Sequence, residues 1–116
     1  MHEMALAESI LGLVEETAAA QGMSGVGRVR AVFLDVGELS SVEPEALLFC
    51  FDAVTRGSVA DGARLEIQRI PGQGWCLNCS RTVPLAALYD PCPECGRHQV
   101  QPTAGQEMRV REFELA

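Results

Sequence analysis

Four cysteines form two matched pairs in the second half of the chain. Each pair has two residues between its cysteines, and twelve residues separate one pair from the other. Two such turns facing one another bring four sulfurs to the corners of a tetrahedron, about 2.3 Å from a single ion. The pattern therefore predicts a structural zinc centre, with the ligands Cys76, Cys79, Cys92 and Cys95.

Four thiolates leave no coordination position for water, so we expect this zinc to be structural rather than hydrolytic. A rubredoxin-type iron uses similar ligands and remains an alternative. Two disulfides fit a reducing compartment poorly, and a redox C-x-x-C needs no second pair. Gly96 follows the second pair and is expected to adopt a positive φ. His98, three residues after Cys95, is expected to be a bystander, although a ligand role stays open.

The first three residues, Met1, His2 and Glu3, form a second candidate metal site. We expect the initiator methionine to be retained, because the next residue is bulky. Its α-amine, the His2 amide nitrogen and the His2 imidazole then form adjoining five- and six-membered chelate rings. Planar nitrogen ligation favours Ni(II) or Cu(II), and the amide must lose its proton for the metal to bind. Glu3 offers its amide or its carboxylate. A solvated terminus that simply leads into a helix is the alternative.

The chain of 116 residues is acidic, with a formal net charge of −7. An acidic chain repels nucleic-acid phosphates and anionic lipids, so neither is an expected partner. The sequence contains no apolar run of about 18 residues that could cross a membrane. It starts with acidic residues instead of the basic region of a signal peptide. We therefore expect a cytoplasmic protein with reduced thiols, in which Cys50 is a buried, inert cysteine.

Helical periodicity predicts two helices. Apolar residues recur at helical spacing over residues 3–21, and glycines follow. The second helix is expected to begin near Pro44 and to end at about Arg56. Ser40 and Glu43 have the spacing of a capping box at its start.

Three segments have the alternating pattern of strands: residues 28–37, 63–70 and 106–115. The apolar phase shifts between Val110 and Phe113, which is compatible with a bulge. The cysteine segment lies between the second and third strands. We expect those two strands to be neighbours in one sheet, with the cysteine module projecting beyond their ends.

Several of these features resemble the HypA/HybF family of nickel chaperones, which serve the maturation of nickel–iron hydrogenases. The resemblance rests on the M-H-E start, the amphipathic first helix, the V-G-E-L-S stretch at residues 36–40, the cysteine pattern and the E-M-R at residues 107–109. These features occur in order over essentially the whole chain.

The resemblance implies an α+β fold with two helices and a three-stranded sheet, plus an inserted zinc-ribbon-like module that carries the four cysteines. The nickel-binding domain would comprise residues 1–71 and 105–116, and the zinc-binding domain residues 72–104. The nickel ligand of the family corresponds to His2, with Met1 and Glu3 completing much of the site. Glu43 lies where some members carry a further acidic residue, and its role stays open.

The resemblance also implies two partners, the GTPase HypB and the large subunit of a nickel–iron hydrogenase, and in some organisms a role for urease. A monomer or weak homodimer is expected, and the zinc and nickel sites are expected to communicate. The alternative is a zinc-ribbon interaction or nucleic-acid-binding module, which the acidic charge disfavours. We expect no enzyme, because the sequence has no nucleophile–base pair and no phosphate loop. Asp35 and Glu38 are expected to be solvated carboxylates.

Overall fold

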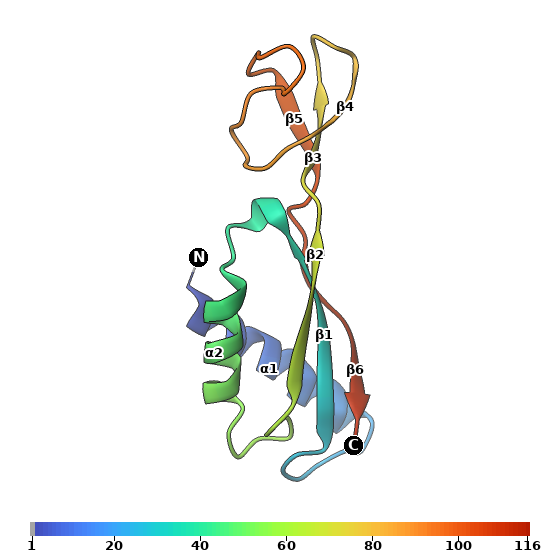
Figure 1. The fold of residues 1–116 in the computed structure, drawn as a ribbon. Helices are drawn as coiled ribbons and strands as arrows, with labels where there is room; N and C mark the ends of the chain where they lie inside the picture. Colours follow the sequence, from blue (N-terminus) through green and yellow to red (C-terminus); the bar gives the residue numbers. More distant parts are fainter. Residues whose placement is uncertain (1) are drawn as a thin grey trace. The chain divides into compact units, whose positions relative to one another are not determined.

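The computed structural model describes residues 2–116 and has the predicted α+β class (Figure 1). The helices are α1 (Glu3–Ala20) and α2 (Pro44–Val54), and the strands are β1 (Val29–Gly37), β2 (Arg64–Ile70), β3 (Gln73–Cys76), β4 (Arg81–Pro84), β5 (Val100–Ala104) and β6 (Met108–Leu115). The cysteine module lies between β2 and β6 along the chain, as predicted. Among the described residues, none of the helices has both the length and the apolar character needed to cross a membrane.

The first sheet has the strand order β2-β1-β6. The expectation that residues 63–70 pair with residues 106–115 was wrong, because β1 lies between them. Burial explains this order. Seven of the nine residues of β1 are buried, whereas β2 has one buried residue and β6 has none. The most apolar strand takes the central position, where neighbours on both edges complete its hydrogen bonds and shield its side chains.

Both helices lie on the same side of this sheet (Figure 1). The two helices bury regularly spaced apolar residues against the core, and these are Ala7, Ile10, Val14 and Ala18 in α1, and Leu47 and Phe51 in α2. The i, i+3, i+4 spacing puts each set on one helical face, as the sequence predicted.

The start of α2 differs from the prediction. Residues Glu38–Ser40 form a 3-10 turn, and the Ser40 hydroxyl donates a hydrogen bond of 2.6 Å to the Gly37 carbonyl. The hydroxyl of Ser40 therefore does not cap α2, and the predicted capping box was wrong. Glu43 occupies the N-cap without a side-chain capping bond, and Pro44 opens the first turn. The helix ends at Val54, two residues earlier than expected.

The chain divides into two compact units. The first unit contains both helices and consists of the residues up to Leu34, Val42–Ile67 and Val110–Ala116. The second unit consists of Asp35–Ser41 and Gln68–Arg109. The second unit holds an antiparallel sheet of order β4-β3-β5, which the sequence analysis did not predict. Its small apolar cluster is built around Cys76, Val83 and Cys92, so two of the predicted metal ligands are themselves core residues.

Candidate metal centres

The four predicted zinc ligands converge on one point in the second unit. Their Sγ atoms all lie within 4.8 Å of one another. The Cys76 and Cys95 sulfurs are 3.7 Å apart, and the Cys79 and Cys92 sulfurs are 3.9 Å apart. A tetrahedron with metal–sulfur bonds of about 2.3 Å has edges of about 3.8 Å, so the cluster has the dimensions of a four-thiolate site. All four thiols are free of disulfides in the structure, and the sulfurs are spaced as ligands of one ion.

Two turns of the same local design present these sulfurs. In the first, the Ser80 N–H donates to the Cys76 carbonyl at 2.8 Å, and in the second, the Gly96 N–H donates to the Cys92 carbonyl at 2.8 Å. Both closing residues have a positive φ, 52° for Ser80 and 75° for Gly96. The prediction for Gly96 is confirmed. Ser80 takes the same left-handed conformation with a side chain, and for that reason no sequence signal marked it.

Backbone N–H groups also point at the first sulfur of each pair. The Cys79 N–H donates to Cys76 Sγ and the Glu94 N–H donates to Cys92 Sγ, both at 3.4 Å. Hydrogen bonds of this kind stabilise the thiolate over the thiol. Cys76 and Cys92, the two buried ligands, thus both receive a backbone hydrogen bond on sulfur.

The four thiols titrate as interacting neighbours. A backbone hydrogen bond at Arg97 lowers the pKa of Cys95 to about 6, and its neighbouring thiols lower it further against the effect of burial. Hydrogen bonding to Cys95 raises the pKa of Cys79 to about 12, with burial acting in the same direction. One thiolate therefore forms readily and opposes the next. A divalent cation removes that opposition, so metal binding at this site is coupled to proton release.

Among the described residues, the cluster consists of the four cysteines alone. His98 is exposed and is not one of the four clustered donors, so its bystander role stays a prediction. An ion pair of 2.7 Å joins Arg81, two residues after the first cysteine pair, to Glu94 within the second, so it ties the two turns together. Cys50 is half-buried in α2, where complete burial had been expected.

The second candidate site lies at the start of α1. Met1 falls outside the described residues. His2 is exposed and is the N-cap of α1, but its side chain makes no capping hydrogen bond. The first helical hydrogen bond runs from the Leu6 N–H to the His2 carbonyl, at 3.1 Å. Because the first N–H groups of a helix have no acceptor within the helix, deprotonation of the His2 amide breaks no helical hydrogen bond.

Glu3 joins the beginnings of the two helices. Its carboxylate accepts a hydrogen bond of 3.2 Å from the backbone N–H of Glu43, the N-cap of α2. This hydrogen bond is the main reason that the pKa of Glu3 lies below its ordinary value. The sequence identified both residues but not their contact, since 40 positions separate them.

The two carboxylates at the end of β1 differ from expectation. Asp35 is buried, and its Oδ2 lies 3.3 Å from Nε of the largely exposed Arg109. Glu38 is exposed, and its Oε1 accepts a hydrogen bond of 3.1 Å from the Gly72 N–H. The expectation that both are simply solvated was therefore wrong for Asp35, whose neighbours on the central strand leave it inside.

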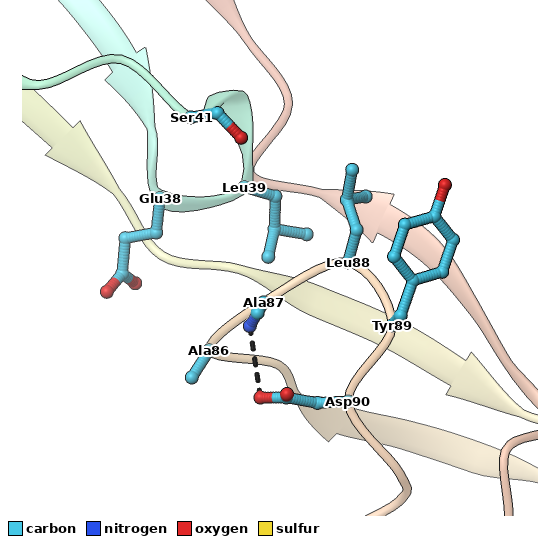
Figure 2. A pocket seen from close by; sticks show the side chains of 8 residues that line it. All are labelled: Glu38, Leu39, Ser41, Ala86, Ala87, Leu88, Tyr89 and Asp90. Atoms are coloured by element: carbon cyan, nitrogen blue, oxygen red, sulfur yellow. Dashed lines mark hydrogen bonds between the residues drawn. The ribbon is translucent and has the colours of Figure 1, made fainter.

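A groove of about 330 Å³ borders the 3-10 turn in the second unit (Figure 2). Leu39 contributes apolar surface, and Tyr89 at the rim is 89% exposed. Its two carboxylates are already engaged with backbone, Glu38 as described and Asp90 through the Ala87 N–H at 3.1 Å (Figure 2). Among the described lining residues, no hydrogen bond pairs a nucleophile with a base, and the groove carries no part of the metal centres.

Comparison with known proteins adds a family match. Residues 1–115 match the family model described as hydrogenase/urease nickel incorporation, metallochaperone, hypA. The hydrogenase maturation factor HypA of Dechloromonas aromatica is 60% identical over 115 residues, which cover 99% of each chain. The factor of the same name from Azoarcus sp. is 56% identical, covering 99% of this chain and 98% of its own.

Solved structures match over the same length. The solution structure of the nickel metallochaperone HypA from Helicobacter pylori aligns with a TM-score of 0.66 at 28% identity, covering 99% of this chain and 97% of that one. A second solution structure, of a HypA protein, aligns with a TM-score of 0.69 at 28% identity, covering 100% of this chain and 97% of the other.

Proposed function

The chain belongs to the HypA family of hydrogenase/urease nickel-incorporation metallochaperones, and from this premise we propose that it binds Ni(II) at its N-terminus and delivers the ion during nickel–iron hydrogenase maturation. The proposed nickel ligands are Met1, His2 and Glu3. The family consists of metallochaperones, so the chain is a carrier and not an enzyme, as its sequence indicated.

The observation that carries this proposal is the hydrogen bond from the Glu43 N–H to the Glu3 carboxylate. It fixes residue 3 while His2, one residue earlier, stays exposed with its imidazole unused by the helix. The α-amine, the His2 amide and the imidazole then form a planar donor set of the kind that Ni(II) prefers. Glu3 completes the site through its amide, since its carboxylate is engaged by α2.

An exposed site of this kind suits a carrier. The ligands belong to the first residues of the chain, so few contacts must break when the ion passes to another protein. Protonation of the amide nitrogen releases the ion, which makes affinity strongly dependent on pH.

Nickel titration calorimetry tests the proposal on protein that starts at Met1 without a tag. We expect His2→Ala to lose specific nickel binding and to keep its fold and its cysteine-bound metal. His98→Ala is the matched control, because His98 is the other histidine of the chain and is exposed. Nickel affinity that is the same in His2→Ala as in wild type would end the proposal.

We propose zinc as the resident ion of the four-cysteine cluster. The sulfur–sulfur distances fit a tetrahedral ion, and zinc binds four thiolates without redox chemistry. Bound there, zinc supplies cross-linking and charge neutralisation for residues that have few apolar contacts of their own. Metal analysis of protein purified without added metals distinguishes one equivalent of zinc from iron.

We further propose that the chain has two metal-binding domains. Residues 1–71 and 105–116 would form the nickel-binding domain, and residues 72–104 would form the zinc-binding domain. We also propose that the two metal sites communicate. The segment Asp35–Ser41 belongs to the same compact unit as the cysteine cluster. The Gly72 N–H donates a hydrogen bond to the Glu38 carboxylate, and the Leu39 N–H donates one of 2.7 Å to the Gly105 carbonyl. Along the chain, Val42 alone separates this segment from Glu43. Equal nickel affinity in wild type and in a Cys92→Ala protein that has lost its cysteine-bound metal but kept its helices would argue against communication.

The proposed partners are the GTPase HypB and the large subunit of a nickel–iron hydrogenase, and the chain is proposed to act as a monomer or weak homodimer. Family membership supports a hydrogenase-related partner. We also propose a cytoplasmic location, because four thiol ligands persist where thiols are kept reduced.

A further inference from the structure

Neither helix of the chain carries a basic residue. The two helices contain six acidic residues and no basic residue, namely Glu3, Glu8, Glu15, Glu16, Glu45 and Asp52. All nine basic residues of the chain are arginines, and every one of them lies outside both helices. The helical side of the first unit therefore has an acidic surface.

Two large apolar side chains interrupt this acidic surface on the outward face of α2. Phe49 is 76% exposed and Leu48 is 41% exposed, whereas Leu47 and Phe51 on the opposite face are buried. Glu45 and Asp52 lie one turn before and one turn after this apolar pair, on the same face of the helix. The exposed ring of this phenylalanine contributes nothing to the core, and its contact with water is unfavourable for the folded chain.

The acidic rim is open to a new partner. Asp52 forms an ion pair of 3.6 Å with Arg56, but both side chains are largely exposed, so water screens the attraction. Glu45 has no ion pair among the described residues. An incoming cation can therefore displace water rather than a strong internal contact.

This face begins beside the proposed nickel site. The Glu3 carboxylate contacts the N-cap of α2, and Phe49 follows that N-cap by six residues, which is about 9 Å along a helix axis. A protein seated on Leu48 and Phe49 would therefore have its own groups within reach of the first residues of the chain.

We propose that the outward face of α2, formed by Glu45, Leu48, Phe49 and Asp52, is the docking surface for the protein that exchanges nickel with this chain. The partner presents an apolar patch rimmed by arginine or lysine. A two-fold dimer through this face is a poor alternative, because it would set one acidic helical surface against another. This inference rests on the proposed function and specifies the surface that a partner uses.

The test measures binding of purified HypB and of purified hydrogenase large subunit to the full chain by biolayer interferometry. We expect at least one of them to bind wild type, and Phe49→Ser to weaken that complex about tenfold or more, as for an interface anchor. Glu45→Gln is expected to lower the association rate about threefold, and higher salt to weaken the wild-type complex. Tyr89→Ser, which removes an even more exposed aromatic ring from the second unit, is the matched control and leaves binding unchanged.

Three outcomes overturn the inference. In the first, wild type binds neither protein, and in the second, a Leu48→Ser/Phe49→Ser double variant binds both proteins as tightly as wild type does. In the third, sedimentation shows a wild-type dimer that the Phe49→Ser substitution dissociates. Nickel calorimetry on Phe49→Ser separates this inference from the proposed function. We expect its nickel affinity to equal that of wild type. If wild type itself takes up no nickel, the proposed function fails, and the interferometry still decides whether the surface docks these proteins.

Discussion

Replacing Gly37 with alanine is expected to destabilise the second unit severely. Gly37 ends β1 at a place where the backbone of residues 105–106 crosses it. A Cβ added at Gly37 would overlap the carbonyl group of Gly105 and would lie 2.8 Å from the backbone nitrogen of Gln106. The overlapping atoms are all backbone, so no side chain can rotate away to make room.

The magnitude follows from the hydrogen bonds that hold this crossing. The Gly37 N–H donates to the Glu107 carbonyl and the Leu39 N–H donates to the Gly105 carbonyl, each at 2.7 Å. Separating the two strands enough to admit a methyl group breaks both. Each buried hydrogen bond left unmade costs about 1–3 kcal/mol, so the unfolding free energy should fall by about 2–6 kcal/mol. That loss is a large share of the stability of a small domain, about 5–15 kcal/mol.

The assay is guanidinium denaturation of metal-loaded protein, followed by the fluorescence of Trp75, which lies in β3 of the same unit. The control is Gly12→Ala in α1, where an added Cβ meets no atom within 4 Å. Alanine is the better helix former, so this variant should gain about 0.5–1 kcal/mol, observed by circular dichroism. If Gly37→Ala unfolds within about 1 kcal/mol of wild type, as judged by the same extrapolation, the close crossing of these strands is wrong.

Three further predictions follow from the same structure. Cys92→Ala should lose the resident metal and the ordered β3–β5 sheet, detected by metal analysis and Trp75 fluorescence, while the far-ultraviolet helical signal persists. Phe51→Ala should lower the unfolding free energy by about 3–5 kcal/mol, because Phe51 is fully buried, and Phe49→Ala should change it by less than about 0.5 kcal/mol. Both residues lie in α2, so guanidinium denaturation followed by circular dichroism measures these changes. Arg81→Met should cost under about 1 kcal/mol, since its ion pair with Glu94 is half exposed, and a loss above about 2 kcal/mol would contradict that estimate.

The elements and the metal ligands were predictable because their signals are local. The 3.6-residue period placed α1 within one residue at its end, and the two C-x-x-C pairs identified four sulfurs that do converge. β1 was located within one residue as well. In each case the information lies within a few adjacent residues, or in the fixed chemistry of a thiolate.

Most of the features that sequence reasoning missed depend on contacts between distant residues, and one depends on a competing local turn. The order of the first sheet follows from which strand is most completely buried, and that comparison needs all three strands together. Ser40 has the composition of a helix cap, yet its hydroxyl is used by the turn at Gly37, while Glu43 is bound by Glu3 from the other helix. Local propensity cannot foresee that a competing partner 40 residues away will take the position.

The two candidate metal sites differ in ways that match a resident and a transported ion. At the cysteine cluster, Cys76 and Cys92 are buried core residues, their sulfurs accept backbone hydrogen bonds, and loss of the ion would expose this core. Release there is opposed by the folding free energy of the whole module. At the N-terminus, His2 is exposed and belongs to no buried cluster, so an ion held there can leave without unfolding any part of the chain. Under the proposed assignment of the two sites, this contrast in burial lets one small chain retain one metal ion while it exchanges another.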